Sequence, residues 1–86
     1  MSAVVAFVSM FVDPSRLDAV LSALSRIDCV KEAYEVTGEF DIVSVVSVPD
    51  IERFRDVLKN GIMKIVGVKS TVTSIILNPS SNRTSD

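Results

Sequence analysis

The chain has 86 residues, of which 48% are hydrophobic, and it carries a formal net charge of −2 at pH 7 with no histidine. A chain this short forms one small domain with little interior, so its apolar content predicts that another subunit covers part of its surface. The charge balance, with scattered Lys and Arg, argues against direct DNA binding, and the lack of histidine removes the commonest general base and metal ligand. Cys29 is the single cysteine, which favours a reducing cytoplasm. We therefore expect no catalytic residues, cofactor or metal site.

The chain opens on an apolar run, residues 3–12, that ends at Asp13-Pro14. Its β-branched and aromatic side chains predict a central strand. The run is too short to span a membrane, and neither a basic segment nor a cleavage site marks it as a signal peptide. Asp13 is placed to cap a helix whose first position Pro14 occupies. Apolar side chains then recur at helical spacing from Leu17 to Ile27, which predicts an amphipathic helix.

Residues 29–37 are more polar and have the pattern of an edge strand, where interspersed charges discourage stray pairing. A short turn at Gly38-Glu39 leads into a strongly apolar strand over residues 40–48. The two segments together predict a β-hairpin.

A second helix opens at Pro49-Asp50, and its apolar spacing continues through Gly61 to about residue 64. Residues 68–77 are rich in Thr, Val and Ile and predict the last strand.

The two halves of the chain repeat one plan of strand, helix and strand. Because such crossovers are right-handed, the two units interleave into an α+β, ferredoxin-like β-α-β-β-α-β fold. This fold has an antiparallel four-stranded sheet with the first and third strands central and both helices on one face. We expect it to span residues 1–78, followed by a disordered tail, residues 79–86, that has no apolar pattern.

The first strand is apolar on both faces, because Val5, Phe7 and Phe11 alternate with Val8 and Met10. Leaving about five large apolar side chains wet on the helix-free face would cost ~7–15 kcal/mol, which is the size of a whole domain's stability. The sequence therefore predicts a homodimer whose sheets pack face to face. A monomer with a modest apolar patch is the alternative.

Two segments carry candidate ligand-binding groups. In the hairpin, Gly38 allows a left-handed backbone whose N–H groups suit a carboxylate, and Asp41 suits an ammonium, so the pair fits a zwitterion. On the last strand, Thr71 and Thr73 lie on one side, with hydroxyls that donate and accept hydrogen bonds. The spacing alone also fits a plain hairpin turn with a solvated aspartate, and ordinary edge-strand threonines.

Two motifs, VTGEFDIV at residues 36–43 and GVKSTVT at residues 67–73, resemble the effector-binding (RAM) domain of the leucine-responsive-regulator/AsnC (Lrp/AsnC) family. The resemblance extends over residues 4–77. It implies a non-enzymatic amino-acid sensor that dimerises through its sheet, assembles into octameric or similar rings, and modulates full-length transcriptional regulators of its family. It also implies a pocket between neighbouring dimers, formed by Thr37, Gly38, Glu39, Phe40, Asp41, Ser70, Thr71 and Thr73.

In the pocket that the resemblance implies, Asp41 faces the effector's ammonium, while N–H groups near Gly38 and the threonine hydroxyls bind its carboxylate. Full-length family members carry a helix-turn-helix before this domain, whereas here the first strand begins almost at Met1. The resemblance is therefore to the stand-alone form, which does not read DNA by itself.

Two alternatives share this architecture. One is a small dimeric α+β-barrel enzyme of monooxygenase or isomerase type, whose sites use titratable residues that this chain does not offer convincingly. The other is an ACT-like regulatory module, in which sheets lie side by side and the ligand binds between helices.

Overall fold

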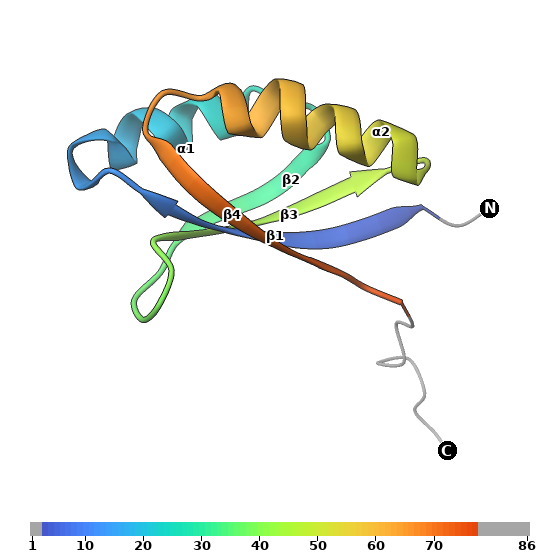
Figure 1. The fold of residues 1–86 in the computed structure, drawn as a ribbon, viewed down its shortest axis with the longest axis horizontal. Helices are drawn as coiled ribbons and strands as arrows, with labels where there is room; N and C mark the ends of the chain where they lie inside the picture. Colours follow the sequence, from blue (N-terminus) through green and yellow to red (C-terminus); the bar gives the residue numbers. More distant parts are fainter. Residues whose placement is uncertain (1–2, 78–86) are drawn as a thin grey trace, which may run out of the picture.

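The computed structural model describes residues 3–77, which form a sheet covered on one face by helices (Figure 1). The strands are β1 (Val4–Val12), β2 (Val30–Glu35), β3 (Ile42–Val48) and β4 (Val68–Ile75). The helical segments are η1 (Pro14–Arg16), α1 (Leu17–Ser25), α2 (Ile51–Asp56), η2 (Val57–Gly61) and η3 (Ile62–Lys64). The tail predicted at residues 79–86 lies outside the described residues.

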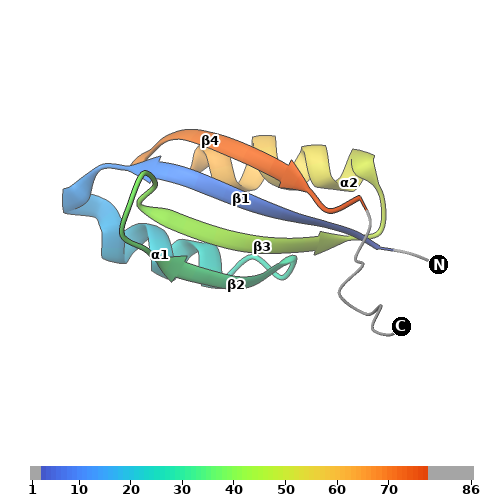
Figure 2. The same cartoon turned by 90° about the horizontal axis from the view of Figure 1, so that it is seen from below.

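The strands form one sheet in the order β2-β3-β1-β4, and each neighbouring pair is antiparallel. The apolar strands β1 and β3 are central, as the sequence predicts. Both helices lie on the same face of the sheet, α1 over β2 and α2 near β4 (Figure 2). The α+β, ferredoxin-like fold is therefore confirmed.

The core lies between the helices and one face of the sheet. Alternate residues of the central strands point into it, and Ala6, Val8 and Met10 of β1 are fully buried. The helices add Val20, Leu24, Phe54, Val57 and Ile62. Ser44 is buried among these apolar side chains, and its hydroxyl donates to the Val8 carbonyl over 3.0 Å, which satisfies the polar group.

The first helical segment starts as the sequence predicts. Asp13 Oδ1 accepts a hydrogen bond from the Ser15 N–H over 3.0 Å and another from the Ser15 hydroxyl over 2.9 Å, and Pro14 takes the first helical position. These two hydrogen bonds, assisted by the charges of Lys69 and Arg16, lower the pKa of the Asp13 carboxyl.

A pH-dependent contribution to stability follows from this cap. A carboxyl whose pKa is depressed by folding stabilises the protein above its unfolded-state pKa, and this contribution disappears as the pH falls through the folded-state pKa. We expect Asp13→Asn to be less stable than the wild type at pH 7, and the gap to close as the pH falls through the folded-state pKa of Asp13. Urea unfolding midpoints at pH 7 and at a series of lower pH values measure the gap, and a gap that stays constant contradicts the prediction.

The second helical segment runs without a break from Ile51 to Lys64, as the apolar spacing predicts, but it is not one regular α-helix. Its middle part, η2, is a π-helix. Val57 and Ile62 are both buried although they lie five positions apart, and the wider π turn brings both to the core. Gly61 takes the position beside Ile27, where a Cβ atom would lie 3.6 Å from the Ile27 Cδ1 atom.

The hairpin loop is longer than predicted. β2 ends at Glu35 and β3 begins at Ile42, so the expected strand ends at residues 37 and 40 are wrong. The N–H of Val36 donates to the Asp41 carbonyl over 3.0 Å and closes the base of the loop. Asp41 also uses its own N–H and carboxylate to bind β1.

Candidate functional site

The face of the sheet opposite the helices is apolar. Phe7 lies at its centre, paired with Val45 of β3 and Ser74 of β4, and it is 42% exposed. Val72 of β4 is 48% exposed, and Tyr34 of β2 is 54% exposed. The two-sided apolar pattern of the central strands is thus confirmed, and exposed apolar side chains gathered on one face are typical of an interaction surface.

Tyr34 combines this apolar face with one polar contact. Its hydroxyl donates a hydrogen bond to Glu32 Oε1 over 3.1 Å, and this bond to the carboxylate raises the pKa of Tyr34. Tyr34 thus offers this face an apolar ring with a polar group at its tip.

The loop between β2 and β3 projects from the helix-free side of the sheet (Figure 1). The ring of Phe40 packs on that of Phe11, with centroids 5.0 Å apart and planes inclined by 48°. Thr37, Gly38 and Glu39 are exposed at the loop tip. The φ angle of Gly38 is +112°, as the turn prediction requires, and a Cβ atom there would meet nothing within 4 Å. The loop tip therefore presents its backbone to open space.

Asp41 is held to the backbone by three hydrogen bonds. Its Oδ2 atom accepts from the Val12 N–H over 2.7 Å, its own N–H donates to the Met10 carbonyl over 3.0 Å, and its carbonyl accepts from the Val36 N–H over 3.0 Å. Asp41 is half-buried. One of its carboxylate oxygens thus has a structural role that sequence reasoning missed.

The candidate residues on β4 divide between the two faces of the sheet. Ser70 pairs with Phe11 and shares the helix-free face with it, because directly opposed residues of antiparallel strands point the same way. Thr71 and Thr73 pair with Met10 and Val8, whose side chains are fully buried on the helix side. Both threonines are half-buried and lie on one side of an edge strand, as predicted.

The end of β1 joins the two candidate segments. Phe40 packs on Phe11, which pairs with Ser70, so that the hairpin and the start of β4 both contact β1. Thr71 and Thr73 lie across the sheet from Phe40 and Ser70. A single chain therefore brings the hairpin and Ser70 close together without collecting all eight predicted residues on one face.

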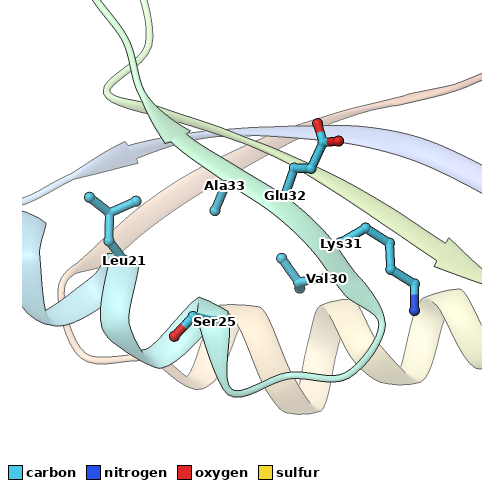
Figure 3. A pocket seen from close by; sticks show the side chains of 6 residues that line it. All are labelled: Leu21, Ser25, Val30, Lys31, Glu32 and Ala33. Carbon is cyan, nitrogen blue, oxygen red and sulfur yellow. The ribbon is translucent and has the colours of Figure 1, made fainter.

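A groove of about 330 Å³ lies elsewhere, between α1 and the edge strand β2 (Figure 3). Apolar side chains form much of its lining, and polar ones stand beside them. Its lining residues are Leu21, Ser25, Val30, Lys31, Glu32 and Ala33. None of these belongs to the predicted site, and Lys31 Nζ donates to the Asp28 carbonyl over 3.1 Å. The groove is the seam between a helix and the outermost strand, and it shows no preference for one ligand chemistry.

Residues 3–77 contain no cluster of three or more His, Cys, Asp or Glu side chains suited to a metal ion. None of the helices among them has the length and apolar character needed to cross a membrane. Cys29 is a half-buried free thiol that packs against the core.

Comparison with known proteins finds relatives of this chain. The model of the family described as "Lrp/AsnC ligand binding domain" matches residues 5–86. The HTH-type transcriptional regulator Ptr1 of Methanocaldococcus jannaschii is 31% identical over 74 residues, which cover 86% of this chain and 50% of the regulator. A homocitrate synthase of Sulfurisphaera tokodaii is 39% identical over 59 residues, which cover 69% of this chain and 13% of that enzyme. The chain thus spans about half the length of the matched regulator.

Solved structures show the same fold. The protein TTHA0845 of Thermus thermophilus superposes with a TM-score of 0.84 and 33% identity, over 87% of this chain and 94% of that one. The feast or famine regulatory protein of Mycobacterium tuberculosis, solved in complex with L-methionine, superposes with a TM-score of 0.75 and 34% identity, over 87% of this chain and 50% of that one.

Proposed function

Because the chain belongs to the Lrp/AsnC ligand-binding domain family, we propose that it is a non-enzymatic module that binds an amino-acid effector and modulates regulators of its family. The observation that carries the proposal is the similar Mycobacterium tuberculosis protein, which was solved with L-methionine. The other matched regulator supports a role in transcription. Such a module needs no catalytic group, and we expect it to act in the cytoplasm.

The proposed effector site is built from the hairpin loop and the first half of β4. The exposed tip at Gly38 offers backbone N–H groups to a carboxylate, and the Asp41 carboxylate offers a counterion to an ammonium. The remaining proposed members are Thr37, Glu39, Phe40, Ser70, Thr71 and Thr73. Because one chain leaves these residues on different surfaces, a neighbouring copy is needed to complete the pocket.

The proposed assembly begins with a homodimer that buries the helix-free face. Phe7 and Val72 are each nearly half exposed in the single chain, and a second copy presents a matching apolar face to cover them. Dimers would then join into a ring of octameric or similar size, with effector sites between them. An effector that binds one assembly better than another shifts the population toward it.

The partner of this assembly is proposed to be a full-length regulator of the same family. Ptr1, of which the chain spans about half, is an HTH-type transcriptional regulator, and in this proposal such a partner reads the DNA. Mixed assembly through the shared apolar face is the simplest physical link. The chain carries a net charge of −2 and contributes no basic stripe for DNA.

Isothermal titration of the proteinogenic amino acids into the purified protein tests the proposal. At least one of them, with L-methionine as the first probe, is expected to bind and to change the molar mass measured by light scattering. Titration with a D-enantiomer of the best binder serves as the matched control. No heat and no change of mass with any of the amino acids would contradict effector binding.

A second candidate function is favoured by the match to homocitrate synthase. The matched segment is a small part of that enzyme, so a domain of this type would act as an effector-binding module of an enzyme. Both functions predict amino-acid binding, and they differ in the partner. Addition of the effector-loaded protein should change DNA binding by a full-length regulator in the first case and leave it unchanged in the second.

A further inference from the structure

We infer that Asp41 is a positioning residue, whose hydrogen bond to Val12 sets the effector-binding hairpin in place relative to β4. This inference rests on the proposed function and assigns Asp41 a role besides that of a counterion. The Oδ2 atom of Asp41 lies 2.7 Å from the Val12 nitrogen, which is short for a bond from a backbone N–H to a carboxylate. The two residues are 29 positions apart, so the contact joins separate segments.

The hydrogen bond between Val12 and Asp41 lies at the end of the β1–β3 ladder. Met10 pairs with Ile42 in the last step of that ladder, and the Met10 carbonyl accepts from the Asp41 N–H. Val12 lies two residues past the last residue of β1 that pairs with β3. The Asp41 carboxylate accepts the Val12 N–H in place of the backbone carbonyl that a longer β3 would have offered. The Asp41 carboxylate therefore continues the hydrogen bonding to β1 past the end of β3, at the point where the chain turns into the hairpin loop.

The other side of the same segment is fixed to β4. Val12 pairs with Val68, and the N–H of Asp13 donates to the Gly67 carbonyl over 2.8 Å. The pairing register shifts between Phe11 and Val12, so β4 carries one additional residue at this point. The end of β1 is thus held from one side by Asp41 and from the other by the start of β4.

This arrangement gives Asp41 control over the distance between the two halves of the site. Loss of the Oδ2 bond frees the hairpin base from Val12 and leaves Ser70 attached to β1 through Phe11. The Asp41 N–H still donates to the Met10 carbonyl and Phe40 still packs on Phe11, but the N–H groups at Gly38 and the polar groups of β4 are then held less rigidly relative to one another. Binding groups must be held to within a fraction of an ångström to act together, so affinity should fall.

Two variants separate positioning from charge. Asp41→Asn removes the charge but keeps a side-chain oxygen that accepts from Val12, whereas Asp41→Ala removes both. We expect the Val12 amide proton to exchange with solvent about tenfold faster or more in Asp41→Ala than in Asp41→Asn, as measured by NMR. L-Methionine, or the best binder of the amino-acid panel, should bind Asp41→Ala about tenfold more weakly than Asp41→Asn at a temperature where both are fully folded.

The outcomes are distinct. Equal Val12 exchange in the two variants overturns the inference, whether or not an amino acid binds. Faster exchange in Asp41→Ala with equal loss of affinity in both variants also overturns it, because the charge alone would then account for binding. If the wild type binds no amino acid while the exchange rates differ as expected, the proposed function fails but the structural part of the inference stands.

Discussion

Phe7→Asp should dissociate the proposed homodimer. Phe7 lies at the centre of the helix-free face and is 42% exposed in the single chain, so the substitution costs the isolated domain little. In the dimer, it would place an unpaired carboxylate from each copy between two apolar faces. Burying even one unpaired charge costs about 3–5 kcal/mol, which corresponds to a rise of about 10²-fold to nearly 10⁴-fold in the dimer dissociation constant.

Sedimentation velocity over a range of concentrations measures this change. Ala19→Asp serves as the control, because Ala19 is exposed on α1, on the opposite side of the molecule from the helix-free face. The control is expected to keep the wild-type dimer dissociation constant. A Phe7→Asp protein that dimerises like the wild type would show that the helix-free face is not the dimer interface.

Gly67→Ala should destabilise the protein more than Ala at either of the other two glycines. The φ angle of Gly67 is +110°, and a Cβ atom there would lie 2.6 Å from Arg16 Cβ and 3.1 Å from Val20 Cγ2. Backbone strain and this collision together should cost about 2–4 kcal/mol. For a domain of this size, such a loss lowers the melting temperature by roughly 10–25 °C.

Gly38→Ala is the matched control for this prediction. The φ angle of Gly38 is +112°, almost the same as at Gly67, but a Cβ atom there would meet nothing within 4 Å. Only the backbone strain remains, which we expect to cost about 1–2 kcal/mol. Thermal unfolding followed by circular dichroism compares the two variants. Equal losses would mean that the contact of Gly67 with the first helical segment does not limit stability.

Local patterns account for most of the fold. The helix starts at Asp13-Pro14 and Pro49-Asp50, the helical spacing from Leu17 and the two-sided apolar strand β1 each depend on neighbouring residues, and the structure confirms them. The first helix is shorter than its apolar spacing predicts, because α1 ends at Ser25 and leaves Ile27 outside it. The π turn in the second helical segment was not predicted. It arises because Val57 and Ile62 must both reach a core whose shape is set by the sheet and by Ile27.

The candidate site could be predicted less completely from local sequence patterns. The motif around Gly38 located a hairpin with a positive φ angle, which the structure shows. The hydrogen bond from Val12 to Asp41 could not be read from spacing, because it depends on β1 lying between β3 and β4. The division of Ser70 from Thr71 across the sheet follows from alternation along β4, but which face each takes depends on pairing with β1.

Shielding of the helix-free sheet by a second copy is the claim on which the proposed site and assembly depend. Static light scattering of the wild-type protein at about 10 µM without effector tests it most directly. A shielded sheet predicts a particle of at least twice the 9.3 kDa chain mass. A stable, compact particle of one chain mass would contradict the dimer, and with it a pocket completed by a neighbouring copy.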